Sequence, residues 1–84
     1  ERQSLLPLAQ PLWTELNPAQ QQTLAPFAAE WNIWPAAEKR SWVSLSDRMP
    51  SMAPEKRQKM TERIIEWARL TPEERQTARD NYRL

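Results

Sequence analysis

The sequence contains no cysteine, no histidine and no glycine among its 84 residues. Without cysteine there is neither a disulfide nor a thiolate metal site. Without histidine the chain lacks the commonest metal ligand and the commonest general base at neutral pH. Without glycine, the phosphate-binding loops of P-loop and dinucleotide proteins are excluded, because their backbone must approach the phosphates closely. A carboxylate-only calcium or magnesium site stays open, although no segment resembles an acidic EF-hand loop. We therefore expect no enzyme, no catalytic residue, no cofactor and no metal site.

The charges are nearly balanced, and long apolar runs are missing. Twelve basic and eleven acidic side chains give a net charge of +1. They form no concentrated basic face, so we expect no nucleic-acid partner. No apolar run approaches the roughly 18 residues that a membrane-spanning helix needs, so no transmembrane segment is expected. No signal peptide is visible, and the start at Glu1 fits a trimmed form.

Eight prolines mark the expected helix starts. Proline suits the first turn of a helix, where its missing N–H would lack an intrahelical partner anyway. Asn17–Gln20 and Thr71–Glu74 also have the pattern of a capping box. The sequence predicts helices over residues 18–31, 35–48, 54–69 and 72–82, after a short turn at 11–13. Pro26 falls inside the first helix and predicts a bend near residues 22–25.

Apolar residues recur at spacings of three and four, which places each set on one face of its helix. The predicted stripes are Leu24, Phe27 or Ala28, and Trp31; Trp42, Leu45 and Met49; Met60, Ile64 and Trp67; and Ala78 with Tyr82. Each stripe is too small to stabilise an isolated helix, so the helices must pack together.

An internal repeat appears when the sequence is shifted by 36 residues. Residues 16–42 then align without a gap with residues 52–78, and Trp31 pairs with Trp67. Similar pairs include Lys39 with Arg75. We expect one all-α domain over residues 1–84, with repeat one at 16–42, repeat two at 52–78 and an N-terminal extension at 1–15. The fold expected is four short helices in a tandem αα-hairpin repeat, as a compact or slightly elongated bundle.

The tryptophans divide into two pairs. Trp31 and Trp67 are in register in the repeat, so we expect both in the core. Trp34 and Trp42 pair with Leu70 and Ala78, so the shared scaffold does not demand an aromatic ring at either position. A core role is still slightly favoured for both, and these two are the candidate protein-binding residues if a surface cluster binds a partner. The three methionines offer thioethers for Cu(I), but packing is the favoured interpretation.

Several motifs resemble a proteobacterial family of uncharacterised proteins, the domain of unknown function 3106. The resemblance covers residues 11–83 and rests on these segments: Leu16–Trp31, Glu38–Trp42, Met49–Glu55, Trp67–Arg75 and Ala78–Arg83. It carries no established activity. Its members usually look like exported proteins, often encoded near extracytoplasmic-function sigma factors, which implies a periplasmic or exported location and a link to stress signalling. The helix starts at Leu16–Gln20 and Leu70–Glu74 are also similar to the Leu-Thr-x-x-Gln motif of periplasmic Spy-type chaperones.

These observations favour a non-catalytic helical protein-interaction module of the bacterial cell envelope. The partner protein is not identified by any residue. A Spy-like holdase chaperone and a structural domain that self-associates stay open as alternatives, and a DNA-binding module is less favoured.

Overall fold

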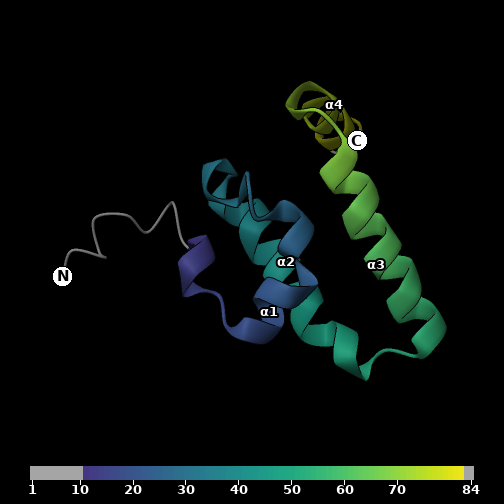
Figure 1. Ribbon diagram of the computed structural model, residues 1–84. Coiled ribbons are helices and arrows are strands. Elements are labelled where there is room, and N and C mark those ends of the chain that lie inside the picture. The colour runs from purple at the N-terminus through teal and green to yellow at the C-terminus, as the bar shows by residue number, and fades with distance from the viewer. Residues whose placement is uncertain (1–10, 83–84) are drawn as a thin grey trace.

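The computed structural model describes residues 11–82, and these form helices joined by short connections, without a strand (Figure 1). The α-helices are α1 (Pro18–Thr23), α2 (Ala36–Arg48), α3 (Pro54–Arg69) and α4 (Pro72–Tyr82). Short 3-10 helices are η3 (Trp13–Glu15), η4 (Ala25–Phe27), η5 (Trp31–Ile33) and η6 (Met49–Ser51). The predicted all-α fold with four helices is confirmed. No helix in this part of the chain is long and apolar enough to cross a membrane.

The first predicted helix is broken, as Pro26 implied. It starts with the predicted capping box, in which the side chains and backbone of Asn17 and Gln20 exchange hydrogen bonds of 2.8 and 2.9 Å. It ends at Thr23, which confirms the bend, because Pro26 has no N–H to donate. A single helix through Trp31 is therefore wrong. The chain continues through η4 and η5 instead, and their tight turns carry Phe27 and Trp31 into the core.

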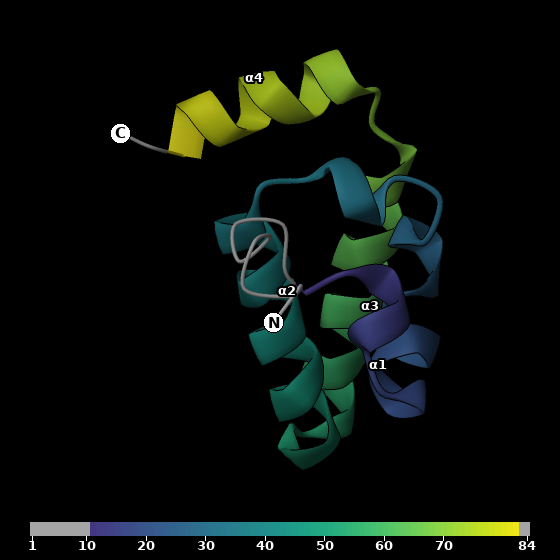
Figure 2. The same ribbon diagram turned by 90° about the vertical axis from the view of Figure 1, so that its left-hand side faces the viewer.

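Helices α2 and α3 form a hairpin through η6, with α1 and η4 lying against it (Figures 1 and 2). Helix α4 crosses the end of this hairpin where α2 begins and α3 finishes, and its axis lies across theirs (Figure 2). Its start carries the second predicted capping box, because Thr71 and Glu74 exchange hydrogen bonds of 2.8 and 3.1 Å. The N-terminal end of α4 is therefore capped by residues next to it in the sequence.

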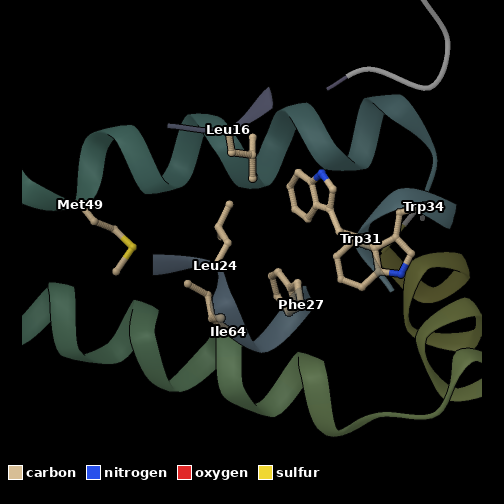
Figure 3. Close-up of a cluster of buried hydrophobic side chains, with 7 residues drawn as sticks. All are labelled: Leu16, Leu24, Phe27, Trp31, Trp34, Met49 and Ile64. Carbon is tan, nitrogen blue, oxygen red and sulfur yellow. The ribbon is translucent and has the colours of Figure 1, made fainter. Parts of the chain in front are cut away.

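The core lies between α2 and α3 and is filled largely from the broken first segment (Figure 3). Its buried members are Leu16, Leu24, Phe27, Trp31, Trp34, Met49 and Ile64. Trp42, Leu45, Met60 and Trp67 pack against this cluster and are partly buried, which confirms the predicted stripes of α2 and α3. In the first segment Phe27, not Ala28, faces inward. The side chain of Tyr82 lies outside what the structure describes, as does the N-terminal extension up to residue 10.

The two predicted repeat units have different helices. The second holds the unbroken sixteen-residue α3, whereas the corresponding part of the first is divided into α1, η4 and η5. A tandem αα-hairpin repeat therefore stays a prediction.

Candidate protein-binding surface

All five tryptophans and the single phenylalanine join in one continuous chain of ring contacts. Its order is Trp13, Trp31, Trp34, Phe27, Trp42 and Trp67, with centroid distances between neighbours of 5.9, 5.8, 4.8, 4.8 and 6.2 Å. Edge-to-face and tilted pairs of this kind add about 0.5–1.5 kcal/mol each beyond their burial. The rings link η3, η4, η5, α2 and α3, so the aromatic chain connects elements from the start of the described chain to the end of α3.

The structure places both candidate binding residues within this chain. Trp34 is only 6% exposed and Trp42 is partly buried, while Trp67, expected deep in the core, is also only partly buried. The ranking by repeat position was therefore wrong for Trp34, which is more buried than Trp67. Binding through Trp34 and Trp42 stays a prediction, but neither ring stands on an open face.

Arg75 is the buried residue that joins α4 to the rest of the domain. Its side chain is 2% exposed, and its guanidinium carbon lies 5.3 Å from the centre of the Trp34 ring. The guanidinium pairs with Glu30 and donates hydrogen bonds to the carbonyl oxygens of Trp67 (3.2 Å) and Leu70 (2.7 Å). Those two carbonyls lie at the end of α3, where the helix offers few backbone donors, and that of Trp67 also accepts from the N–H of Leu70 at 3.2 Å. The side chain of Arg75 therefore caps the C-terminal end of α3, pairs with the carboxylate of Glu30 and covers the ring of Trp34.

A second arginine of α4 lies one turn further on and makes a parallel contact. Arg79 Nε donates to Glu38 Oε1 at 2.7 Å, from side chains that are 26% and 14% exposed. Burial lowers the pKa of the Arg75 guanidinium, and the nearby positive charge of Arg79 lowers it further. The carboxylates of Glu30 and Glu38 offset this repulsion. Together the two pairs, Arg75–Glu30 and Arg79–Glu38, form what we call the arginine latch of α4.

A shallow groove of about 270 Å³ runs beside the latch, between α4 and the start of α2. We call it the α4 groove; it is lined by Ile33, Trp34, Pro35, Pro72, Arg75, Gln76 and Arg79. Ile33 stands at the edge with 78% of its surface in solvent, the most exposed large apolar side chain of the described residues. An exposed apolar residue beside tryptophan and arginine matches the composition of protein-binding sites.

Lys39 is a buried cation at the start of α2, in the position that the repeat pairs with Arg75. Its side chain is 0% exposed, and its Nζ donates to the carbonyl oxygen of Asn32 at 3.2 Å. Burial lowers the pKa of this amine, and the negative charge of Glu15 partly opposes that effect. Both members of the sequence pair are thus buried cations that donate to backbone carbonyls. The pairing of Lys39 with Arg75 was visible in the sequence, but their burial was not anticipated.

The lowered pKa of Lys39 predicts how stability depends on pH. The folded state releases the proton at lower pH than the unfolded chain, so unfolding takes up a proton between those two pKa values. The contribution of Lys39 to the free energy of unfolding therefore rises with pH from its folded pKa to about 10.4, the ordinary value for lysine. Replacement by methionine, Lys39→Met, removes this dependence. At pH 7 we expect the variant to be as stable as the parent chain or more stable, because a buried charge is lost.

Urea melts at pH 7, 8, 9 and 10 test this prediction. The stability of the parent chain relative to Lys39→Met should increase over this range. Lys59→Met is the matched control, because Lys59 is exposed on α3. A difference between parent and Lys39→Met that stays constant, or that shrinks with pH, would contradict the assignment.

In residues 11–82, no group of three or more acidic side chains is placed to hold a metal ion. The residues that the sequence did not predict as members of one site are Ile33, Glu30, Glu38, Arg75 and Arg79. The 36-residue shift aligns Glu30 and Glu38 with Glu66 and Glu74, but nothing local in the sequence pairs them with arginines more than forty residues away.

Comparison with known proteins identifies the family of the chain. No curated protein and no solved structure matches it. The family described as "Protein of unknown function (DUF3106)" matches residues 13–84, which includes the broken first segment, the α2–α3 hairpin and α4. The resemblance seen in the proline and tryptophan motifs is thereby confirmed, and the chain belongs to the DUF3106 family.

Proposed function

We propose that the chain is a non-catalytic protein-interaction module of the bacterial cell envelope and binds its partner at the mouth of the α4 groove. The observation that supports this most is the exposure of Ile33, at 78%, next to a groove with Trp34 at its floor. Burying an isoleucine side chain contributes roughly 1.5–3 kcal/mol. Tryptophan and arginine, which line the groove beside Ile33, are enriched among the residues that contribute most to protein binding.

The envelope location and a regulatory link to stress signalling are parts of the same proposal. Their support is the exported character that the family resemblance implies. A Spy-like holdase needs a broad apolar surface for unrelated clients. Among the side chains described in residues 11–81, the large exposed apolar ones are Ile33 and Ile65. This limited surface favours one specific partner over many unfolded ones.

Affinity capture with matched variants tests the proposal. Ile33→Asp places a charge at the mouth of the groove, and Ile65→Asp places one on the outer face of α3, where Ile65 is 38% exposed. Both should fold normally, since surface substitutions usually change stability by about 0.5 kcal/mol or less. We expect the parent chain and Ile65→Asp to capture the same protein from an envelope fraction. Ile33→Asp should recover at least about tenfold less, because the apolar contact is lost.

Three results would contradict this function. One is equal capture by Ile33→Asp, which would place the contact elsewhere. Another is capture of nothing by the parent chain. The third is suppression of aggregation of several unrelated unfolded proteins, which would favour the holdase.

A further inference from the structure

Helix α4 is attached to the domain mainly by polar contacts. Among its side chains at residues 72–81, Arg75 is buried, Ala78 and Arg79 are partly buried, and the others are exposed. An amphipathic helix normally docks by an apolar stripe. In α4 the two arginines of the latch, and not an apolar stripe, make the docking contacts. Hollows lie on both sides of the helix. One is the α4 groove, and the other is lined by Arg63, Glu66, Trp67, Leu70 and Ala78.

The surface beneath α4 has a definite chemistry. Glu30 and Glu38 present carboxylates from two different elements, and the Trp34 ring lies where Arg75 covers it. Residues four apart lie on the same face of a helix, so one helix can deliver two guanidiniums to this surface. The carbonyls of Trp67 and Leu70 complete the set of acceptors. We call this surface, beneath α4, the latch seat.

Two buried polar atoms near α4 have no partner while the helix is docked. Among the side chains described in residues 11–81, these atoms are Glu38 Oε2 and Trp67 Nε1. Glu38 is held by Arg79, and Trp67 lines the hollow beside Ala78. A buried acceptor and a buried donor without partners make the docked state costly.

The connection to α4 permits its release as an intact helix. Only Leu70 and Thr71 separate the end of α3 from Pro72, and Leu70 is extended, with φ −69° and ψ 147°. The capping box of Thr71 and Glu74 lies within the connection and first turn of α4 itself. Undocking therefore breaks the latch but leaves the helix start capped.

We propose that α4 is a displaceable lid, and that the latch seat binds a helix of another protein carrying two arginines one turn apart. This inference rests on the proposed binding function and names the kind of partner. The partner's helix takes the place of α4 beside Ile33, which belongs to η5 and not to the lid. The partner's arginines replace Arg75 and Arg79 on Glu30, Glu38 and the Trp34 ring. Because α4 competes for the same seat, the chain binds weakly until the lid opens.

A peptide experiment on the full chain tests the lid. The probe is an unlabelled peptide with the sequence of residues 71–82, which carries both arginines in helical register. The full chain is labelled with ¹⁵N, so that NMR detects its own α4 amides. The control peptide has glutamine in place of both arginines. We expect the arginine peptide to bind at least about tenfold more tightly, and to speed the hydrogen exchange of the chain's α4 amides.

Two chain variants sharpen the test. Arg79→Gln weakens the lid and leaves the seat intact, so it should bind the arginine peptide about tenfold more tightly than the parent chain does. Glu38→Gln removes a carboxylate that the lid and the peptide share, so it weakens both and should leave the apparent affinity within about a factor of three of the parent chain. Circular dichroism checks that both variants keep their helices. A peptide that merely adheres to the surface would bind Arg79→Gln and the parent chain equally.

Several results would overturn the inference. No binding of the arginine peptide, equal binding of the two peptides, or binding that leaves the α4 amides protected would each exclude displacement. A dimer formed by the concentrated chain alone, with α4 exchanged between copies, would assign the seat to a second copy. If the Ile33→Asp capture experiment succeeds while the peptide fails, the proposed function stands and the displaceable lid alone is wrong.

Discussion

Replacement of Trp31 by alanine is expected to remove a large share of the domain's free energy of unfolding. The ring is 0% exposed, contacts Trp13 and Trp34, and donates from its indole nitrogen to the carbonyl oxygen of Pro11 at 2.9 Å. Truncating a buried tryptophan to alanine costs about 3–5 kcal/mol. Small domains have total stabilities of about 5–15 kcal/mol, so this loss is a large share of the total. Urea melts monitored by circular dichroism measure the effect.

Trp13→Ala is the matched control, because Trp13 is only partly buried and has one ring contact. It should cost about 1–2 kcal/mol. Trp34→Leu should lower the free energy of unfolding by an amount closer to that of Trp31→Ala than the repeat comparison suggested. The reason is that the Trp34 ring contacts Phe27, Trp31 and Arg75. If Trp31→Ala is no more damaging than Trp13→Ala, the aromatic chain does not form the core.

Replacement of Arg75 by methionine is expected to destabilise the domain by about 2–3 kcal/mol. Methionine keeps an apolar stem of similar length and removes the guanidinium. Glu30 then loses its partner and the carbonyl of Leu70 loses this donor, while the carbonyl of Trp67 keeps the N–H of Leu70. The side chain of Glu30 is 39% exposed, so water compensates it partly and the loss falls below that of a fully buried pair.

Arg69→Met is the control for this change, because Arg69 is exposed at the end of α3. Its effect should stay within about 0.5 kcal/mol. A double-mutant cycle with Glu30→Gln then isolates the ion pair from the other contacts of Arg75. Equal stabilities of Arg75→Met and Arg69→Met would contradict the latch.

The helix boundaries were largely predictable because their causes are local. Proline at the first turn and a capping side chain act over three or four residues, so α3 and α4 begin and end where expected. The start of α2 was placed within one residue. The first helix was predicted too long, because a proline signals a break but does not specify the conformation of the residues after it. There the chain continues as two 3-10 turns, which burial of Phe27 and Trp31 stabilises.

The candidate site was much less predictable because its contacts are distant in sequence. Arg75 and Glu30 are 45 residues apart, and Arg79 and Glu38 are 41 apart. No spacing rule connects such pairs. The repeat also misled the interpretation of Trp34, because its partner Leu70 implied that a ring was unnecessary. In the folded chain Arg75 covers the ring of Trp34. The first repeat unit has a lysine, Lys39, at the position that corresponds to Arg75.

The most direct test of the central claim is a hydrogen-exchange footprint of the captured partner on the full chain. The account predicts slower amide exchange in residues 31–38, which contain η5, Ile33 and the first turn of α2. Protection confined to α3, or no change anywhere in the chain, would contradict it.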